Sequence, residues 1–560
     1  MQKIFRVMII IAMLITAYLL ILAWRDDYAD APAVDTVPKT ATSVGADIPS
    51  TSGAASDIPV QTLPVDTGAV AATPAASAGL ITVTTDRYDI KINPEGGDIV
   101  YAALKQYDAT LDSDKPFVLL ENNSNRVYVA QSGLIGQNGI DTAEGRAKYS
   151  HAANNYVMEK GQQTLSVPLT YKKDGVTVTK TFTFTQDKYP IDISYQIQNA
   201  SANAWQGQMF AQLKRDDSKD PGMSDKGALS MATYLGGAWG TPDDPYNKLK
   251  FGKFNDGELT TTSDKGWVGI VQHYFVSAWT PENFTGKFFS RETGDEYFIG
   301  FNSQPVNVAP NKQVTLNATL YAGPKVQSEL KEVAVGLNQT VDYGLLWPIS
   351  KILFAVLDGI HKVIGNWGWS IILLTILVKI ALMWFSNKSY YSMAKMRAIA
   401  PRLAALKEEH GDDRMKMSQE MMAIYKEEKV NPMAGCLPIL MQMPIFLALY
   451  WVLVESVELR HAPWILWIQD LSAMDPWFIL PLLMGASMFV QQQLNPQPAD
   501  PMQAKVMKFL PIIFTAFMLF FPAGLVLYWT VNNLFSMTQQ YLINRKVEEE
   551  QKRRTVKVLD

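Results

Sequence analysis

The chain has 560 residues, too many for one ordinary domain, and its composition changes from a polar first half to a strongly apolar last third. The formal net charge of −4 gives no reason to expect direct DNA binding. Its single cysteine, Cys436, excludes an intrachain disulfide, and the 5 histidines show no ligand spacing, so we expect no metal site. Since common phosphate-binding and hydrolase motifs are also missing, we expect neither a cofactor nor a catalytic centre.

Residues 1–27 form a predicted transmembrane anchor. Lys3 and Arg6 precede the apolar run Val7–Trp24, which is long enough to cross a bilayer. Cleavable signal peptides have a shorter apolar core, and Pro32 directly follows the small residues where cleavage would occur. The basic residues before the run predict a cytoplasmic N-terminus.

A flexible periplasmic linker is predicted for residues 28–79, which are rich in Ala, Pro, Thr and Ser. A β-sandwich domain is predicted for residues 80–330, because apolar and polar residues alternate there between Gly, Asn and Asp turns. The alternation is regular in Ile81–Thr84, Tyr88–Ile92, Gln163–Val167, Val176–Phe184, Ile191–Ile197 and Val314–Tyr321. The segment Trp267–Phe275 predicts a buried strand with a satisfied His273 rather than a ligand site.

The region that follows alternates between amphipathic and apolar segments. Residues 341–362 predict an interfacial amphipathic helix rather than a span. Residues 386–430 carry nine Lys or Arg against seven Asp or Glu and show helical periodicity, with a turn signal at Gly411–Asp413, so we expect a cytoplasmic hairpin of two helices. The predicted spans of the core, residues 363–543, are Trp369–Phe385, Met433–Val454, Trp477–Val490, Val506–Phe521 and Leu525–Ile543. With the anchor, this gives six spans and places the basic tail, residues 544–560, in the cytoplasm.

Lys379 is the most informative residue of these spans. It interrupts the apolar stretch Trp369–Phe385, where an ionisable group costs roughly 2.5–3.5 kcal/mol on insertion scales. Such a residue usually faces the interior of a helix bundle or a water-filled cavity. In the alternative interpretation, its long stem carries the ammonium group to the cytoplasmic headgroups.

The last third resembles the YidC family of membrane protein insertases. The resemblance rests on long ordered motifs in Gly365–Gly368, Ser392–Met396, Ser418–Met422, Lys429–Pro432, Gln442–Tyr450, Asp470–Pro476 and Phe521–Trp529. The N-terminal half, with Thr85-Asp86 and Gly96-Gly97-Asp98, is similar to the Gram-negative form. That form implies a periplasmic β-supersandwich similar to sugar-epimerase folds and a five-helix membrane core.

The resemblance implies a function and a set of site residues. The family inserts newly made proteins into the inner membrane, alone or with the Sec translocon, through a hydrophilic groove open to the cytoplasm and laterally to lipid. A positive residue in the groove is thought to attract acidic substrate tails. Here it is Lys379 where arginine is usual, which keeps the charge and loses the planar fork. The positions that match the substrate groove are Thr375, Lys379, Gln442, Met443, Phe446, Tyr528 and Trp529.

The implied partners are nascent membrane proteins, membrane lipids, the Sec translocon with its accessory subunits, and the ribosome, which would meet the hairpin and the basic tail. Two other classes stay open from the residues themselves. A secondary transporter would use Lys379 as a substrate or proton site and usually shows internal repeats, of which we find none. An enzyme active on sugars would need a carboxylate and a histidine converging in a cleft of the β-domain.

Overall fold

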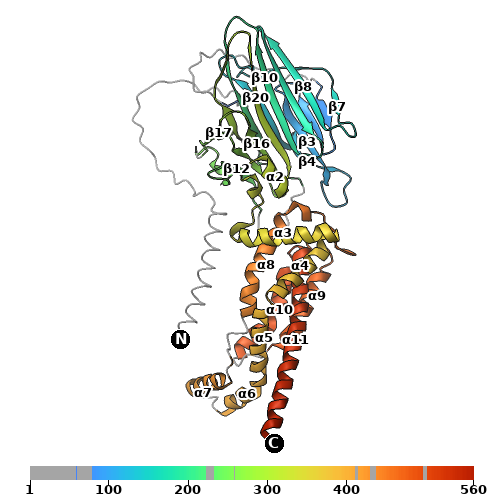
Figure 1. Cartoon of the computed structure of the whole chain (residues 1–560), viewed down its shortest axis with the longest axis vertical. Helices are drawn as coiled ribbons and strands as arrows, with labels where there is room; N and C mark the ends of the chain where they lie inside the picture. Colours follow the sequence, from blue (N-terminus) through green and yellow to red (C-terminus); the bar gives the residue numbers. More distant parts are fainter. Residues whose placement is uncertain are drawn as a thin grey trace, which may run out of the picture. The chain divides into compact units, whose positions relative to one another are not determined.

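The computed structural model describes residues 58–59, 79–221, 233–257, 259–409, 414–428, 430, 437–495 and 501–559. The predicted anchor and almost all of the predicted linker lie outside the described residues. Figure 1 shows the strands gathered in one part of the chain and the long helices in another.

Within the described residues, the first half forms two large sheets of almost entirely antiparallel strands. The 11-stranded sheet contains, in spatial order, β14 (Thr262–Ser263), β17 (Gly286–Thr293), β18 (Glu296–Ser303), β11 (Trp205–Asp216), β5 (Arg126–Ile135), β4 (Pro116–Asn123), β3 (Asp98–Asp108), β2 (Tyr88–Asn93), β1 (Ile81–Thr84) and β7 (Asn155–Val157), with β19 (Val306–Val308) beside β11. The 9-stranded sheet contains β13 (Asn247–Leu249), β12 (Gly236–Gly240), β15 (Trp267–Val271), β16 (Phe275–Pro281), β20 (Lys312–Pro324), β10 (Pro190–Asn199), β9 (Val176–Thr185), β8 (Thr164–Lys173) and β6 (Ser150–His151).

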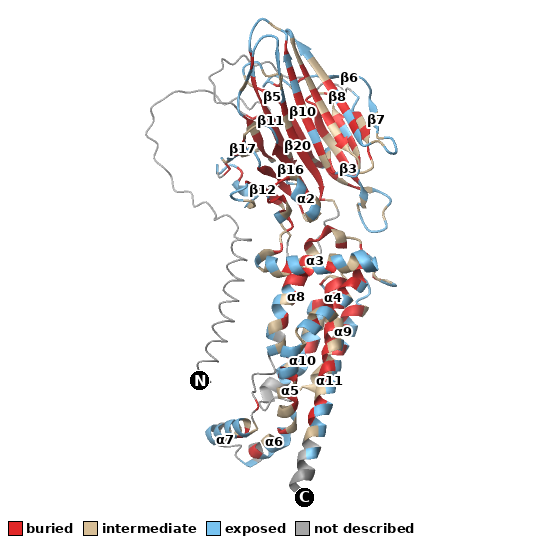
Figure 2. Ribbon diagram, in the orientation of Figure 1, coloured by how far each residue is buried: buried red, intermediate tan, exposed pale blue. Residues whose placement is uncertain are grey.

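The core of this domain follows from the alternation in its strands. β9 pairs with β10 so that Phe182 lies opposite Ile193 and Phe184 opposite Ile191, and all four side chains are buried. Figure 2 shows buried residues running along the strands of the domain. The predicted all-β sandwich is therefore confirmed.

The second half is helical. Its helices are α2 (Gln327–Val333), α3 (Trp347–Ile364), α4 (Trp367–Ala381), α5 (Met383–Ala398), α6 (Ala400–Glu409), α7 (Arg414–Glu427), α8 (Leu437–Glu455), α9 (Ile479–Leu494), α10 (Pro501–Met518) and α11 (Ala523–Leu559). Short 3₁₀ turns lie at η2 (Leu337–Thr340), η3 (Gly344–Leu346) and η5 (Val457–Leu459), and another, η1 (Phe251–Lys253), lies in the β-domain.

The motif Gly365-Asn366-Trp367-Gly368 makes the sharp junction between α3 and α4. Gly365 has a φ of 73°, which suits glycine, and its N–H donates to the His361 carbonyl to close α3. The Asn366 side chain then accepts from the Trp369 N–H at 3.1 Å and caps α4. At Gly368 a Cβ would come within 2.2 Å of the Trp464 ring, so only glycine allows this close packing.

Two helix boundaries differ from the sequence prediction. The predicted two-helix hairpin of residues 386–430 contains three helices, because Tyr390, Met393 and Ala394 give α5 a buried face that prolongs the helical core. α6 and α7 then form the pair, joined by the ion pair of Arg402 and Glu427. α11 continues through the predicted basic tail, in which no glycine or proline interrupts the helix.

The predicted number of spans is not confirmed. Among the described residues, the segment Gly344–Ile364, which contains α3, is the one straight helix long and apolar enough to cross a membrane, and α4 with α5 forms a second candidate bent by 69°. The first candidate, α3, is the helix that was predicted from the sequence to lie at the membrane interface instead of crossing the membrane. Figure 1 shows α3 lying across the direction of α4, α8 and α11.

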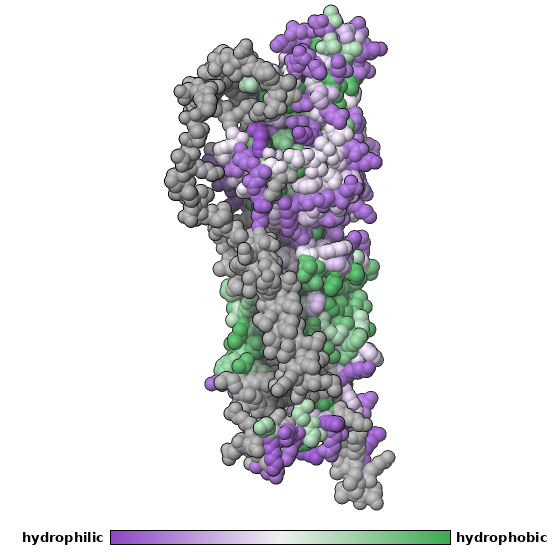
Figure 3. Space-filling model, turned by 90° about the vertical axis from the view of Figure 1, so that its left-hand side faces the viewer, coloured by the Kyte–Doolittle hydropathy of each residue, from purple (hydrophilic) through white to green (hydrophobic). Residues whose placement is uncertain are grey.

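The outer surface of the helices is apolar. α4 exposes Trp369, Leu373, Leu377 and Ile380, while α9 and α10 expose further large side chains. On the face drawn in Figure 3, apolar residues form a band over the helical part, with hydrophilic surface on either side. An exposed apolar surface of this extent is typical of contact with lipid.

Candidate functional site

Lys379 lies inside the helix bundle. Its side chain is 7% exposed, and Nζ donates to Ser536 Oγ on α11 at 2.8 Å. Thr375, one turn earlier on the same face of α4, is also buried and donates to the Ile371 carbonyl. The ammonium group therefore points toward α11, inside the bundle. The alternative interpretation, in which the stem carries this group to the cytoplasmic headgroups, would require it to point out of the bundle.

Four other predicted residues form two pairs between α8 and α11. The Gln442 amide nitrogen donates to the Tyr528 hydroxyl, and both side chains are buried. The rings of Phe446 and Trp529 meet edge to face, with centroids 4.7 Å apart. The structure thus brings Gln442, Phe446, Tyr528 and Trp529 together. Tyr528 and Ser536 are separated by about 12 Å along α11, because the helix rises about 1.5 Å per residue.

Met443, the last of the predicted site residues, belongs to neither pair. It is 39% exposed, whereas its neighbour Gln442 is 7% exposed. Successive residues of a helix point about 100° apart, so Met443 and Gln442 point in different directions from α8.

α11 also carries polar residues that face the core and were not predicted from the sequence. Asn532, Asn533, Ser536, Gln539 and Gln540 are all buried, although they lie in a segment predicted only as an apolar span. Their spacing of three and four residues was the available signal, because it places a polar stripe on the helix. Gln539 donates to Ser386 Oγ and Asn387 Oδ1 on α5, and Asn533 donates to Ser487 Oγ on α9.

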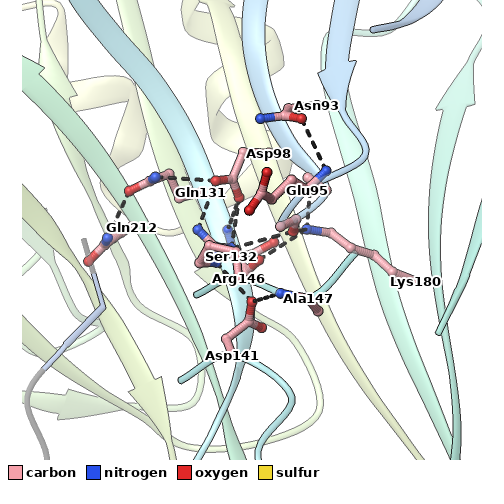
Figure 4. A network of polar contacts seen from close by, with 12 residues as sticks. Asn93, Glu95, Asp98, Gln131, Ser132, Asp141, Arg146, Ala147, Lys180 and Gln212 are labelled. Atoms are coloured by element: carbon pink, nitrogen blue, oxygen red, sulfur yellow. Dashed lines mark hydrogen bonds and ion pairs between the residues drawn. The ribbon is translucent and has the colours of Figure 1, made fainter. Parts of the chain in front are cut away.

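The β-domain contains a separate polar network (Figure 4). Arg146 forms ion pairs of 2.8 Å with Asp98 and with Asp141. Lys180 is fully buried, and its Nζ donates to the carbonyls of Gly96, Gly97 and Ser132. Burial lowers the pKa of Lys180 to about 7, and the three carbonyls offset part of the cost of its charge. We infer that this network holds the two sheets together.

A cleft of about 200 Å³ lies beside this network. Its lining includes the carboxylates of Glu95 and Asp98 but, among the described residues, no histidine. Asp98 is already bound to Arg146 and Gln131. The cleft therefore lacks the pairing of a free carboxylate with a histidine that an enzyme active on sugars would need.

These features define a class of protein: a helical membrane protein with a large all-β domain and a buried cation among polar side chains in its bundle. Comparison with known proteins identifies the family. The YidC periplasmic domain model matches residues 80–356, and the 60Kd inner membrane protein model matches residues 359–551. The membrane protein insertase YidC of Ectopseudomonas mendocina (strain ymp) is 48% identical over 571 aligned positions, covering 97% of this chain and 98% of that protein.

The chain therefore belongs to the YidC family of membrane protein insertases. It is a non-enzymatic insertase of the inner membrane with a periplasmic domain, and it acts on newly made membrane proteins.

Solved structures resemble the chain more weakly. The crystal structure of an active YidC insertase with its first transmembrane domain resolved covers 83% of this chain and 93% of its own length, with 18% identity and a TM-score of 0.36. A galactose mutarotase-like protein from Lactobacillus casei ATCC 334 covers 44% of this chain and all of its own length, with 10% identity and a TM-score of 0.29.

Proposed function

We propose that Lys379 attracts acidic residues of a substrate's polar tail within a hydrophilic groove lined by α4, α8 and α11. One observation carries the proposal. Lys379 is buried in the bundle, yet no described residue forms an ion pair with it. A buried cation without a counter-ion is costly, and an incoming carboxylate would supply the missing charge.

The groove would lower the barrier that a polar tail meets in hydrocarbon. The buried amides and hydroxyls around Lys379 offer hydrogen bonds that lipid cannot give. The apolar segment of the substrate would then leave sideways into lipid along α8 and α11. Burial of that segment drives the step, so the mechanism needs no nucleotide.

This function requires a defined topology. We propose six spans, with both termini in the cytoplasm, and α3 lying at the periplasmic interface. The orientation of α3 in Figure 1 supports its interfacial placement, as do its exposed apolar residues Trp347, Ile352 and Val363.

We also propose that the α6–α7 pair and the C-terminal end of α11 receive the ribosome, and that the chain works alone or beside the Sec translocon. Residues 544–560 carry six Lys or Arg against four Asp or Glu, and residues 386–430 carry nine against seven, so each segment has a formal net charge of +2. Both segments should therefore attract an anionic ribosome, and the C-terminal end, which is the shorter of the two, has the higher density of positive charge.

Crosslinking to a translating substrate tests the groove. A photoreactive residue at Met443 should crosslink to the apolar segment of a nascent membrane protein during insertion, because Met443 is partly exposed directly beside the buried Gln442. The same residue at Ile512, which α10 also exposes, should give little product. Equal yields at the two positions would show general lipid-side contact and contradict the placement.

The periplasmic domain should be largely dispensable for insertion, because the proposed groove residues all follow Gly344. A chain lacking residues 80–330 should insert model substrates at close to the parent rate, measured by protease protection at matched protein levels. A second deletion of residues 80–324 retains Lys325, which binds Glu455, and separates loss of this ion pair from loss of the domain. Loss of insertion in both stable variants would overturn the prediction.

A further inference from the structure

Ser536, which accepts a hydrogen bond from the Lys379 ammonium group, belongs to a row of polar residues along one face of α11. Tyr528, Asn532, Ser536 and Gln539 follow one another at intervals of four or three residues, so they share one face of the helix. All four are buried. The row therefore faces the other helices rather than lipid.

The hydroxyl of Ser536 has a hydrogen-bond acceptor on its own helix. It donates its proton to the Asn532 carbonyl at 2.7 Å, one turn earlier on α11. Its oxygen lone pairs remain, and they accept from Lys379 Nζ at 2.8 Å. A hydroxyl that donates to its own helix acts toward the lysine only as an acceptor.

The surroundings of Ser536 suit a polar occupant. Asn532 Oδ1 and Gln539 Oε1 lie on either side of it along the row, are buried, and have no hydrogen-bond partner among the described residues. Buried amide oxygens are usually satisfied by protein or by water. Water or the N–H groups of an incoming chain would satisfy both oxygens.

We infer that Ser536 is a positioning residue that fixes the Lys379 ammonium group where an acidic side chain of the substrate binds. The inference rests on the proposed role of Lys379. A lysine has a flexible stem of four carbons and lacks the rigid fork of arginine, so its charge needs an external acceptor to stay in one place. Without Ser536 the charge remains in the groove but spreads over several positions, and the bound carboxylate loses part of its stabilisation.

The test compares two substrates that differ only in their translocated tails, one with Asp and Glu and one with Asn and Gln. Insertion rates would be measured in proteoliposomes containing the full chain. In Ser536→Ala the ratio of acidic-tail to neutral-tail insertion should fall by about tenfold, a typical effect of losing a hydrogen bond to a charged group. Ser536→Thr, which keeps the hydroxyl, should retain the parent ratio. Ser536→Val, which has the shape of the threonine variant but lacks its hydroxyl, should lose it.

Ser487→Ala is the matched control. Ser487 on α9 is buried, donates to the Met484 carbonyl and accepts from the Asn533 amide, but it does not touch Lys379. This variant should leave the ratio unchanged.

Two outcomes would overturn the inference. The first is that Ser536→Ala and Ser536→Val both keep the parent ratio of acidic-tail to neutral-tail insertion, although Lys379→Ala lowers this ratio. The other is an equal fall for both substrates, which indicates a structural role alone. If Lys379→Ala itself leaves the ratio unchanged, the proposed role of Lys379 fails, and this result is distinguishable from the first two.

Discussion

Replacing Lys325 with methionine should destabilise the full chain strongly. Lys325 follows β20, and its Nζ donates to Glu455 Oε2 at 2.8 Å and to the Thr340 carbonyl. Both ionic side chains are almost completely buried, at 2% and 4% exposure. Removing one partner leaves a buried charge without compensation, which costs about 3–5 kcal/mol. The double variant Lys325→Met with Glu455→Leu should recover most of this loss, because neither charge remains.

Thermal unfolding of the purified chain in detergent would measure this effect. Lys188→Met is the control, since Lys188 and Glu332 form an ion pair of similar length that is half-exposed or more. Such exposed pairs contribute only about 0–1 kcal/mol, so this variant should unfold near the parent temperature. An unchanged midpoint in Lys325→Met would contradict the expected role of the buried pair.

Charge reversal at Lys379 should have the largest effect on insertion. Lys379→Arg should retain function, because it keeps the positive charge. Lys379→Ala should lower insertion of acidic-tail substrates by about tenfold, the typical effect of losing a hydrogen bond to a charged group. Lys379→Glu should be worse, because it repels the tail as well as failing to attract it.

Insertion of each variant at matched protein levels checks this order. Neutral-tail substrates serve as the control and should be much less affected by every substitution. If Lys379→Ala matched the parent on acidic tails, the groove would act through its water and shape alone.

The β-domain could be predicted from sequence because its strands have one polar and one apolar face. The alternation in Val176–Phe184 and Ile191–Ile197 gave the strands β9 and β10 with the expected buried residues. The pairing order of the two sheets could not be predicted, since it depends on contacts between residues far apart in the sequence.

In the helical half, a single exceptional residue was easier to identify than its partners. Lys379 stands out because one charge in an apolar run is expensive. Ser536, Asn532 and Gln539 are each tolerable in a span, so only their shared helical face and their contacts with α4 and α5 reveal them. Likewise, nothing in the sequence pairs Lys325 with Glu455, which lie 130 positions apart.

The most direct measurement of the central claim is a double-mutant cycle between the insertase and its substrate. Insertion rates would be measured for the parent and Lys379→Ala, each with the acidic tail and with its neutral counterpart. If Lys379 binds the acidic groups, the substitution should slow the acidic substrate by about tenfold and the neutral substrate far less, so the two changes are not additive. Equal factors for both substrates would contradict a charge interaction between Lys379 and the tail.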